Sequence, residues 1–136
     1  MDRKIILEPP FINNNGKIQN LILGNISCVS LIESVKGSMR SNHYHKTDYH
    51  YLYIISGSLL YLERKVGENN IPEPILYTKG QMFFTPELME HVTIFLEDTV
   101  MISMSKNKRS HELHEKDVVR VSFISEEIKN EFLRKR

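Results

Sequence analysis

Residues 37–57 read GSMRSNHYHKTDYHYLYIISG and hold three of the six histidines of the chain within eight positions. His43 and His45 are two residues apart, so on an extended strand both imidazoles project from the same face. His50 has the opposite parity, and a bend over residues 46–48 is needed before a second strand runs from 49 to 56. After that bend His50 can face the same point as the other two.

A fourth histidine, His91, ends a second segment with strong turn signals. Residues 80–91 read GQMFFTPELMEH, in which Gly80 and Pro86 mark turns around a short apolar strand. Both histidine segments therefore combine a strand with a turn.

Together the two segments resemble the cupin superfamily. The first cupin motif, G-x5-H-x-H-x(3 or 4)-E-x6-G, is matched by Gly37, His43, His45, His50 and Gly57, with His50 where the family usually has Glu. The second motif, G-x5-P-x-G-x2-H-x3-N, is matched by Gly80, Pro86 and His91, with Leu88 in place of the inner Gly and Phe95 in place of the Asn. Two motifs in the right order, over residues 37–95, make the resemblance specific.

Short strands dominate the rest of the pattern. Strands are expected at 4–7, 17–23, 26–35, 49–56, 58–66, 75–77, 81–85, 91–96 and 100–105, with a turn at residues 13–16 and a hairpin at Gly57. Turn signals about every ten residues favour an all-β sandwich or barrel. The cupin resemblance implies a double-stranded β-helix, a small jelly-roll barrel, formed by a single domain of residues 1–136.

Only the end of the chain has a helical pattern. Ser125 can cap a short C-terminal helix, and Glu126 and Glu127 suit its positive amino end. Residues 110–117, SHELHEKD, contain an H-x-x-H pair, but the segment is polar except for Leu113. We expect an exposed loop there and no second metal site, because no third ligand matches the pair.

Composition excludes several classes of function. The chain has 136 residues, 40% of them hydrophobic and 26% charged, and a net charge of +1. These values are typical of a soluble globular protein and provide no field that would attract nucleic acid or a membrane surface. No apolar run approaches the roughly 20 residues needed to span a bilayer, and the single cysteine, Cys28, suits a reducing compartment. We expect a cytoplasmic protein.

The histidine cluster predicts a metal centre. Neutral imidazole is a good ligand for transition metals, and the motifs imply that His43, His45, His50 and His91 hold one divalent ion, of zinc, iron, nickel, manganese or copper. Proton transfer needs a further group, for which Asp48, Tyr44 and Glu90 are the candidates. Alternation along a strand directs Glu90 away from a site that His91 occupies. Arg40 is a candidate for binding an anionic substrate, although it does not share the parity of His43 and His45.

Tyrosines are concentrated around the first motif. Tyr49, Tyr51 and Tyr53 alternate along one strand face, opposite His50, and are expected to pack against another sheet or subunit. A jelly roll of this size presents sheet edges and aromatic faces that need covering, so a homodimer is expected.

Three functions remain open at this point. The leading hypothesis is a metal-dependent cupin enzyme, of the isomerase, lyase or dioxygenase type, that acts on a small polar or anionic molecule. An alternative is a metal-independent cupin that isomerises or epimerises nucleotide-linked sugars for surface polysaccharides, with His43 or His45 as the base and Arg40 facing a phosphate. A third is a cupin that binds a small ligand without catalysis.

Overall fold

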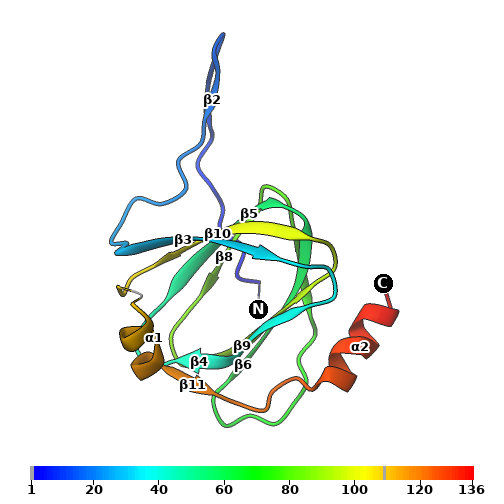
Figure 1. Ribbon diagram of the computed structural model, residues 1–136. Helices are drawn as coiled ribbons and strands as arrows, with labels where there is room; N and C mark the ends of the chain where they lie inside the picture. Colours follow the sequence, from blue (N-terminus) through cyan, green and yellow to red (C-terminus); the bar gives the residue numbers. More distant parts are fainter. Residues whose placement is uncertain (1, 109) are drawn as a thin grey trace.

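A computed structural model of the protein describes residues 2–108 and 110–136, and it is built almost entirely from antiparallel strands (Figure 1). One sheet contains, in spatial order, β3 (Cys28–Ser34), β10 (Thr99–Ser105), β5 (His50–Ser56) and β8 (Met82–Thr85). The other contains β11 (Val118–Arg120), β4 (Met39–His45), β9 (Met89–Phe95), β6 (Ser58–Lys65) and β7 (Ile75–Thr78). The predicted all-β jelly roll is therefore confirmed.

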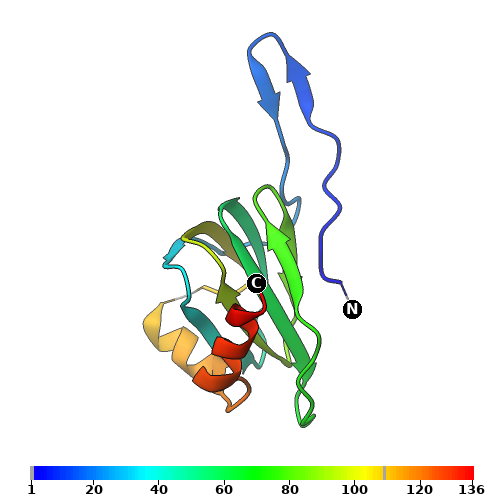
Figure 2. The same cartoon turned by 90° about the vertical axis from the view of Figure 1, so that its right-hand side faces the viewer.

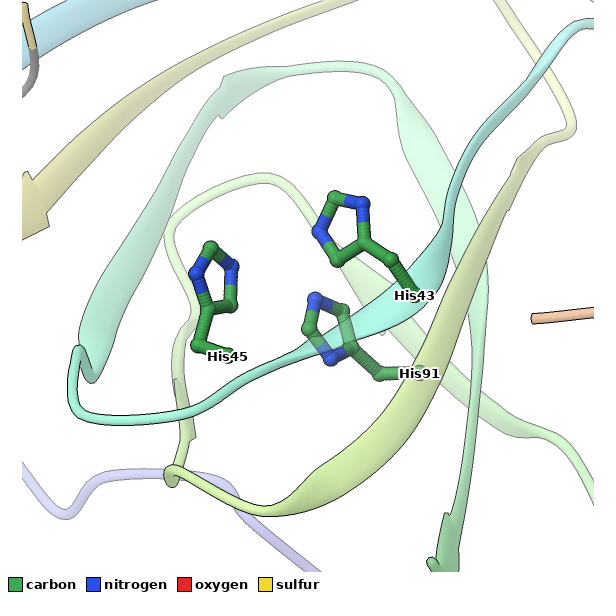
Figure 3. A group of neighbouring side chains, drawn as sticks. All are labelled: His43, His45 and His91. Atoms are coloured by element: carbon green, nitrogen blue, oxygen red, sulfur yellow. The ribbon is translucent and has the colours of Figure 1, made fainter. Parts of the chain in front are cut away.

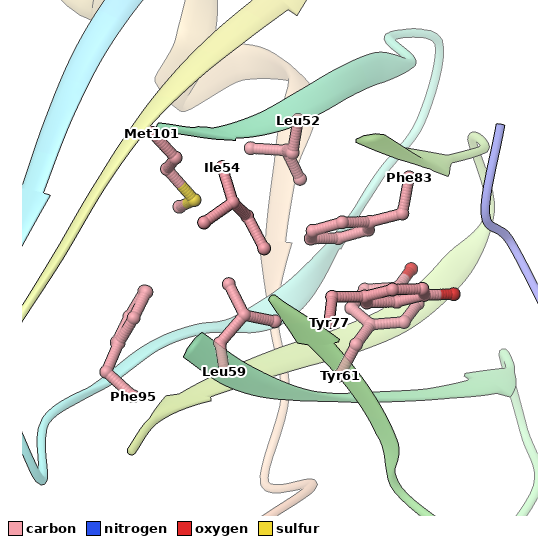
Figure 4. Close-up of a cluster of buried hydrophobic side chains, with 8 residues drawn as sticks. All are labelled: Leu52, Ile54, Leu59, Tyr61, Tyr77, Phe83, Phe95 and Met101. Atoms are coloured by element: carbon pink, nitrogen blue, oxygen red, sulfur yellow. The ribbon is translucent and has the colours of Figure 1, made fainter. Parts of the chain in front are cut away.

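The core lies between the two sheets, because inward-facing positions alternate along each strand. On β5 the buried residues are His50, Leu52 and Ile54, whereas Tyr51 and Tyr53 on the other face are only half-buried. Figure 4 shows the apolar cluster that results, formed by Leu52, Ile54, Leu59, Tyr61, Tyr77, Phe83, Phe95 and Met101. The Tyr77 and Phe83 rings stack with centroids 4.5 Å apart. This cluster fills one end of the barrel and leaves the other end for polar residues.

A second apolar cluster covers the outer face of the five-stranded sheet. The C-terminal helix α2 (Glu126–Arg134) and the segment before it pack onto Leu60, Leu62, Val92 and Ile94. Strand β6 is thus buried on both faces, which explains its continuous apolar run. Ser125 caps α2 by accepting a hydrogen bond from the Ile128 N–H, as predicted.

The predicted hairpin at Gly57 is wrong. Strands β5 and β6 meet at this glycine, but β5 pairs with β8 and β10 whereas β6 pairs with β7 and β9. Gly57 has φ of 96°, and a Cβ atom there would collide with the Thr99 hydroxyl and lie 2.6 Å from the Asp98 carbonyl oxygen. Glycine is required because the chain turns from one sheet into the other against this backbone.

The N-terminal part differs from the predicted strands. Residues 4–7 contribute only an isolated bridge between Lys4 and Phe83, and the strand expected at 17–23 is limited to β2 (Gly16–Ile18). With β1 (Phe11–Asn13), β2 forms a hairpin around the predicted turn. Figures 1 and 2 show this hairpin extending well away from the barrel.

Two helices complete the described part of the chain, α2 and the shorter α1 (His111–Asp117). The expected exposed loop at 110–117 is therefore wrong. Ser110 accepts a hydrogen bond from the Leu113 N–H and so caps the helix. Among residues 2–108 and 110–136, no helix has the length and apolar character needed to cross a membrane.

Candidate functional site

Four histidines from three strands converge at the polar end of the barrel. His43 and His45 come from β4, His50 from β5 and His91 from β9. The ring centroid of His45 lies 4.9 Å from those of His43 and His50 and 5.5 Å from that of His91. Figure 3 shows His43, His45 and His91, whose ring nitrogens approach within 4.8 Å of one another. The sequence motifs thus identified residues that meet in space.

A β-bulge in β4 positions this group. His43 pairs with His91, but the register shifts between Ser41 and His43. Ser41 and Asn42 have positive φ angles, 81° and 64°, which are unusual for residues other than glycine. A bulge inserts one extra residue into a strand and re-aims the side chains on either side of it.

The bulge explains why Arg40 faces the same cavity as His43. Uninterrupted alternation would place Arg40 on the opposite face from His43 and His45, as the sequence alone suggests. Its Nε donates a hydrogen bond to Ser34 Oγ at 2.7 Å, and an Nη donates to the Glu33 carbonyl oxygen at 3.0 Å. None of the described carboxylates forms an ion pair with Arg40, so its charge is available to an anion at the rim.

His45 is completely buried and is oriented by a carboxylate from helix α1. Its Nδ1 lies 2.9 Å from Asp117 Oδ2, and both Thr47 N–H and Thr47 O–H donate to Asp117 Oδ1 at 2.8 Å. Burial of Asp117 favours the neutral acid, but the hydrogen bonds from Thr47 and His45 outweigh it and hold the pKa of this carboxyl below its usual value. The carboxylate is therefore ionised at neutral pH and favours the tautomer of His45 that carries its proton on Nδ1.

Sequence reasoning missed Asp117 and His114. His114 is half-buried, and its ring centroid lies 5.8 Å from that of His45 and 6.2 Å from that of His43. The H-x-x-H pair at 111 and 114 was the available signal, but its polar surroundings favoured an exposed loop. Nothing in the sequence connects Asp117 to a histidine 72 positions earlier.

The predicted proton-transfer residues have different surroundings. Asp48 is buried, and its carboxylate accepts a hydrogen bond from the Asn107 N–H at 2.9 Å. Glu90 forms an ion pair with Arg64 at 2.9 Å, and alternation places it on the sheet face opposite His91. Tyr44 lies between His43 and His45 and pairs with Val119 of β11, so alternation turns its ring away from the histidines.

A cavity of about 500 Å³ opens between β3 and β4 and reaches the histidines. Its polar lining includes Arg40, His43, His50, His91, Ser103 and His114, and its apolar lining includes Ile32, Leu52 and Met101. His45 lies behind this lining. A second cavity, of about 640 Å³, adjoins the first at His114 and is lined by Lys46, Lys106, Lys108 and Lys116. The first cavity is the candidate site because it contacts three histidines of the cluster.

No family model matches the chain, and neither does any curated protein sequence. Solved structures do match. The QdtA 3,4-ketoisomerase from Thermoanaerobacterium thermosaccharolyticum, solved in complex with TDP-4-keto-6-deoxyglucose, is 17% identical with a TM-score of 0.66, and the match covers 96% of this chain and 93% of that one. The dTDP-4-dehydrorhamnose 3,5-epimerase from Sulfolobus tokodaii is 15% identical with a TM-score of 0.63, covering 84% and 73%. The fold is a cupin jelly roll.

The capsular polysaccharide assembling protein CapF from Staphylococcus aureus also contains this cupin fold. It is 22% identical with a TM-score of 0.59, and the match covers 86% of this chain but only 33% of CapF. The chain therefore corresponds to about a third of that protein.

The comparisons contradict the predicted divalent metal at His43, His45, His50 and His91. The cupin structures similar to this chain include sugar isomerases and epimerases, which work without a metal. Close spacing of imidazoles was the basis of the prediction, but spacing alone does not distinguish metal ligands from acids and bases. His45 donates a hydrogen bond to Asp117, which fixes its orientation and tautomer, and an imidazole held in this way can take part in acid–base chemistry without an ion.

Proposed function

We propose that the protein is a metal-independent cupin enzyme that isomerises or epimerises a nucleotide-linked keto sugar. The observation that carries the proposal is the buried His45–Asp117 pair behind a cavity lined by His43, His50 and His91. Similarity to a sugar ketoisomerase and a sugar epimerase supports the same class of substrate.

His43 is the proposed base, because it lines the cavity whereas His45 does not. Its ring meets the His45 ring edge-on, with centroids 4.9 Å apart. In the proposed reaction a neutral imidazole takes the proton from the carbon next to the sugar ketone, and the C–H electron pair moves to form an enolate. Return of the proton to the other face of the same carbon gives the epimer. Return of the proton to the former ketone carbon gives the ketoisomer, provided that the proton of the neighbouring hydroxyl group moves to the former ketone oxygen. His45 and Asp117 act as a positioning pair beneath the base.

Arg40 has a separate role in the proposal. It lies at the rim of the cavity, and no described carboxylate pairs with it, so it is placed to bind the diphosphate of the substrate. The charged part of the substrate then remains at the exposed end while the sugar reaches the histidines.

Proton exchange provides a direct test. Wild-type protein would be incubated in heavy water with TDP-, UDP- and GDP-linked 4-keto sugars, and deuterium at carbons next to the ketone would be followed by NMR. We expect exchange with at least one substrate, and a loss of about 10²-fold or more in His43→Asn, since a positioned base contributes that much. His111→Asn is the matched control, because this exposed histidine of α1 does not line the cavity.

The same experiment distinguishes the non-catalytic alternative. Micromolar binding of a nucleotide sugar without any exchange in the wild type would favour a ligand-binding cupin. Equal exchange in the wild type and His43→Asn would rule out His43 as the base.

A further inference from the structure

Ser103 is a buried polar residue in the cavity wall that the proposed chemistry does not use. It lies on β10 and is 2% exposed, and its hydroxyl has no hydrogen-bond partner among residues 2–108 and 110–136. The side chain lines the cavity together with Leu52 and Met101. A hydroxyl left without a partner among apolar neighbours is unfavourable, and such groups are rare in native proteins.

A neighbouring serine shows that β10 can satisfy a buried hydroxyl at this end of the barrel. Ser105 lies two residues further along the same strand face and is 1% exposed. Its hydroxyl donates to the Asn107 carbonyl oxygen at 3.2 Å. Ser103 differs because its side chain faces the cavity, where a bound molecule can supply the partner.

The positions of the two walls indicate which part of a ligand reaches Ser103. Ser103 belongs to the four-stranded sheet, whereas His43 and His91 belong to the five-stranded sheet that faces it. Packed sheets lie about 10 Å apart, and the cavity of about 500 Å³ between these two has room for one sugar ring. A ring there has His43 and His91 on one side, and the Ser103 hydroxyl together with His50 of β5 on the other.

Arg40 marks a different end of the cavity. It is exposed and donates a hydrogen bond to Ser34, which pairs with Thr99 on β10. Thr99 is four residues from Ser103, or about 13 Å along a strand at roughly 3.3 Å per residue. A diphosphate bound to Arg40 is therefore well separated from Ser103.

We infer that the Ser103 hydroxyl binds a hydroxyl or carbonyl oxygen of the substrate's sugar ring and thereby selects the sugar, while Arg40 holds the diphosphate. A serine hydroxyl suits this role because it both donates and accepts hydrogen bonds. The inference rests on the proposed function and adds a residue that determines its specificity.

The test compares a sugar nucleotide with the nucleoside diphosphate that lacks the sugar. Isothermal titration of Ser103→Ala should show about tenfold weaker binding of the nucleotide sugar that the wild type prefers, and unchanged binding of the nucleoside diphosphate. Ser105→Ala is the matched control and should leave both affinities unchanged. Ser103→Cys keeps a side chain of the same shape but with only a weak S–H donor. It should weaken sugar binding in the same way, and it covers the case in which the alanine variant folds poorly.

Thermal unfolding separates this role from a structural one. Because the Ser103 hydroxyl has no partner to lose within the described part of the chain, Ser103→Ala should unfold at the wild-type temperature or above it, whereas Ser105→Ala should unfold lower. If Ser103→Ala and the wild type bind the same sugar nucleotide equally, the inference is wrong while the proposed function stands. If the wild type binds no sugar nucleotide, both are wrong.

Discussion

The Asp117 carboxylate accepts three hydrogen bonds, two from Thr47 and one from His45, and so fixes the tautomer of a buried imidazole. Asp117→Asn would replace one acceptor oxygen by an amide that donates, which favours the other tautomer of His45. We expect turnover to fall by about 10²-fold or more, a magnitude in the range that positioned acid–base groups contribute. The measurement is the rate of deuterium exchange into a nucleotide-linked keto sugar.

Glu115→Gln serves as the control for Asp117→Asn. It removes a charge from the same helix, but Glu115 is exposed and pairs with Arg120. Its exchange rate should match the wild type, and circular dichroism should show that both variants are folded. Full activity in Asp117→Asn would contradict a positioning role for this carboxylate.

Two buried phenols predict a loss of stability at alkaline pH. Burial raises the pKa of Tyr61 well above its usual value, and burial together with the hydrogen bond to Asp2 does the same for Tyr77. Both folded values lie above the unfolded value of about 10, so the stabilisation is complete below about pH 10 and is lost as the pH rises further. Urea unfolding midpoints should fall above about pH 10, and less steeply in Tyr77→Phe. An equally steep fall in that variant would contradict the assignment to Tyr77.

At the scale of the element, two hydrogen bonds join the bulge in β4 to the segment that follows β11. The Asn42 side chain donates to the Ile124 carbonyl oxygen at 2.8 Å and accepts from the Ile124 N–H at 2.9 Å. Asn42→Ala removes both hydrogen bonds, each worth about 1 kcal/mol. It also places alanine, which adopts positive φ less readily than asparagine, at this position. We expect urea denaturation to show a loss of about 2–3 kcal/mol.

Asn42→Gly separates the two contributions. Glycine adopts positive φ without strain but cannot make the hydrogen bonds. Its loss should be smaller than that of Asn42→Ala by about 1 kcal/mol. Equal losses in the two variants would show that backbone strain contributes nothing at this position.

Local sequence patterns predicted most of the strands, because alternation and turn residues act over a few positions. The meeting of His91 with the other histidines was predicted from the resemblance to the two cupin motifs. Leu88 is a departure from the cupin pattern, yet it keeps the positive φ, 59°, that a glycine would adopt easily. The bulge could not be predicted, because Ser41 and Asn42 give no strong signal for positive φ. Local patterns also do not identify which strands pair. For this reason the two strands that meet at Gly57 were expected to pair with each other.

The candidates for proton transfer show the same limit for the site. Asp48, Glu90 and Tyr44 were chosen because they are neighbours of the histidines in sequence, whereas Asp117 reaches His45 through the folding of α1 against β4. Residues adjacent to a site residue on a strand point to the opposite face. Tyr44 and Glu90, which lie next to histidines on strands, are turned away from them for this reason. Asp48 lies in the bend after β4, and its carboxylate is within 4.8 Å of His45 and Asp117, so it stays a candidate.

At the scale of the whole molecule, the outer face of the four-stranded sheet lacks the helix that covers the other sheet. Val29 and Leu31 on its edge strand β3 are 65% and 64% exposed, and the β1–β2 hairpin extends on the same side with Phe11, Ile12 and Ile18 exposed. Exposed apolar surface of this kind marks an interaction site. We propose that a second copy of the chain covers it, as a homodimer.

Sedimentation velocity tests this proposal at tens of micromolar, within the usual range of dimer affinities. The wild type should sediment as a dimer, and replacing Phe11, Ile12 and Ile18 together by serine should give a monomer. The control is Ile71→Ser, which changes an exposed apolar residue in the loop before β7 and should leave the dimer intact. A monomeric wild type at this concentration would contradict the proposal.

The strand order also determines when the histidines can meet. Strand β4 is paired with β9 and β11, β3 with β10, and His45 with a carboxylate 72 residues away. Contacts between distant parts of a chain form slowly, since loop-closure entropy is lost before they are made, and all-β proteins of this type fold in milliseconds to seconds. On the ribosome, His43 and His45 emerge long before His91 and Asp117 do. In a partly folded chain the imidazoles are therefore still apart and do not form a site. Recovery of activity after denaturation would then report closure of the barrel and not only the formation of strands.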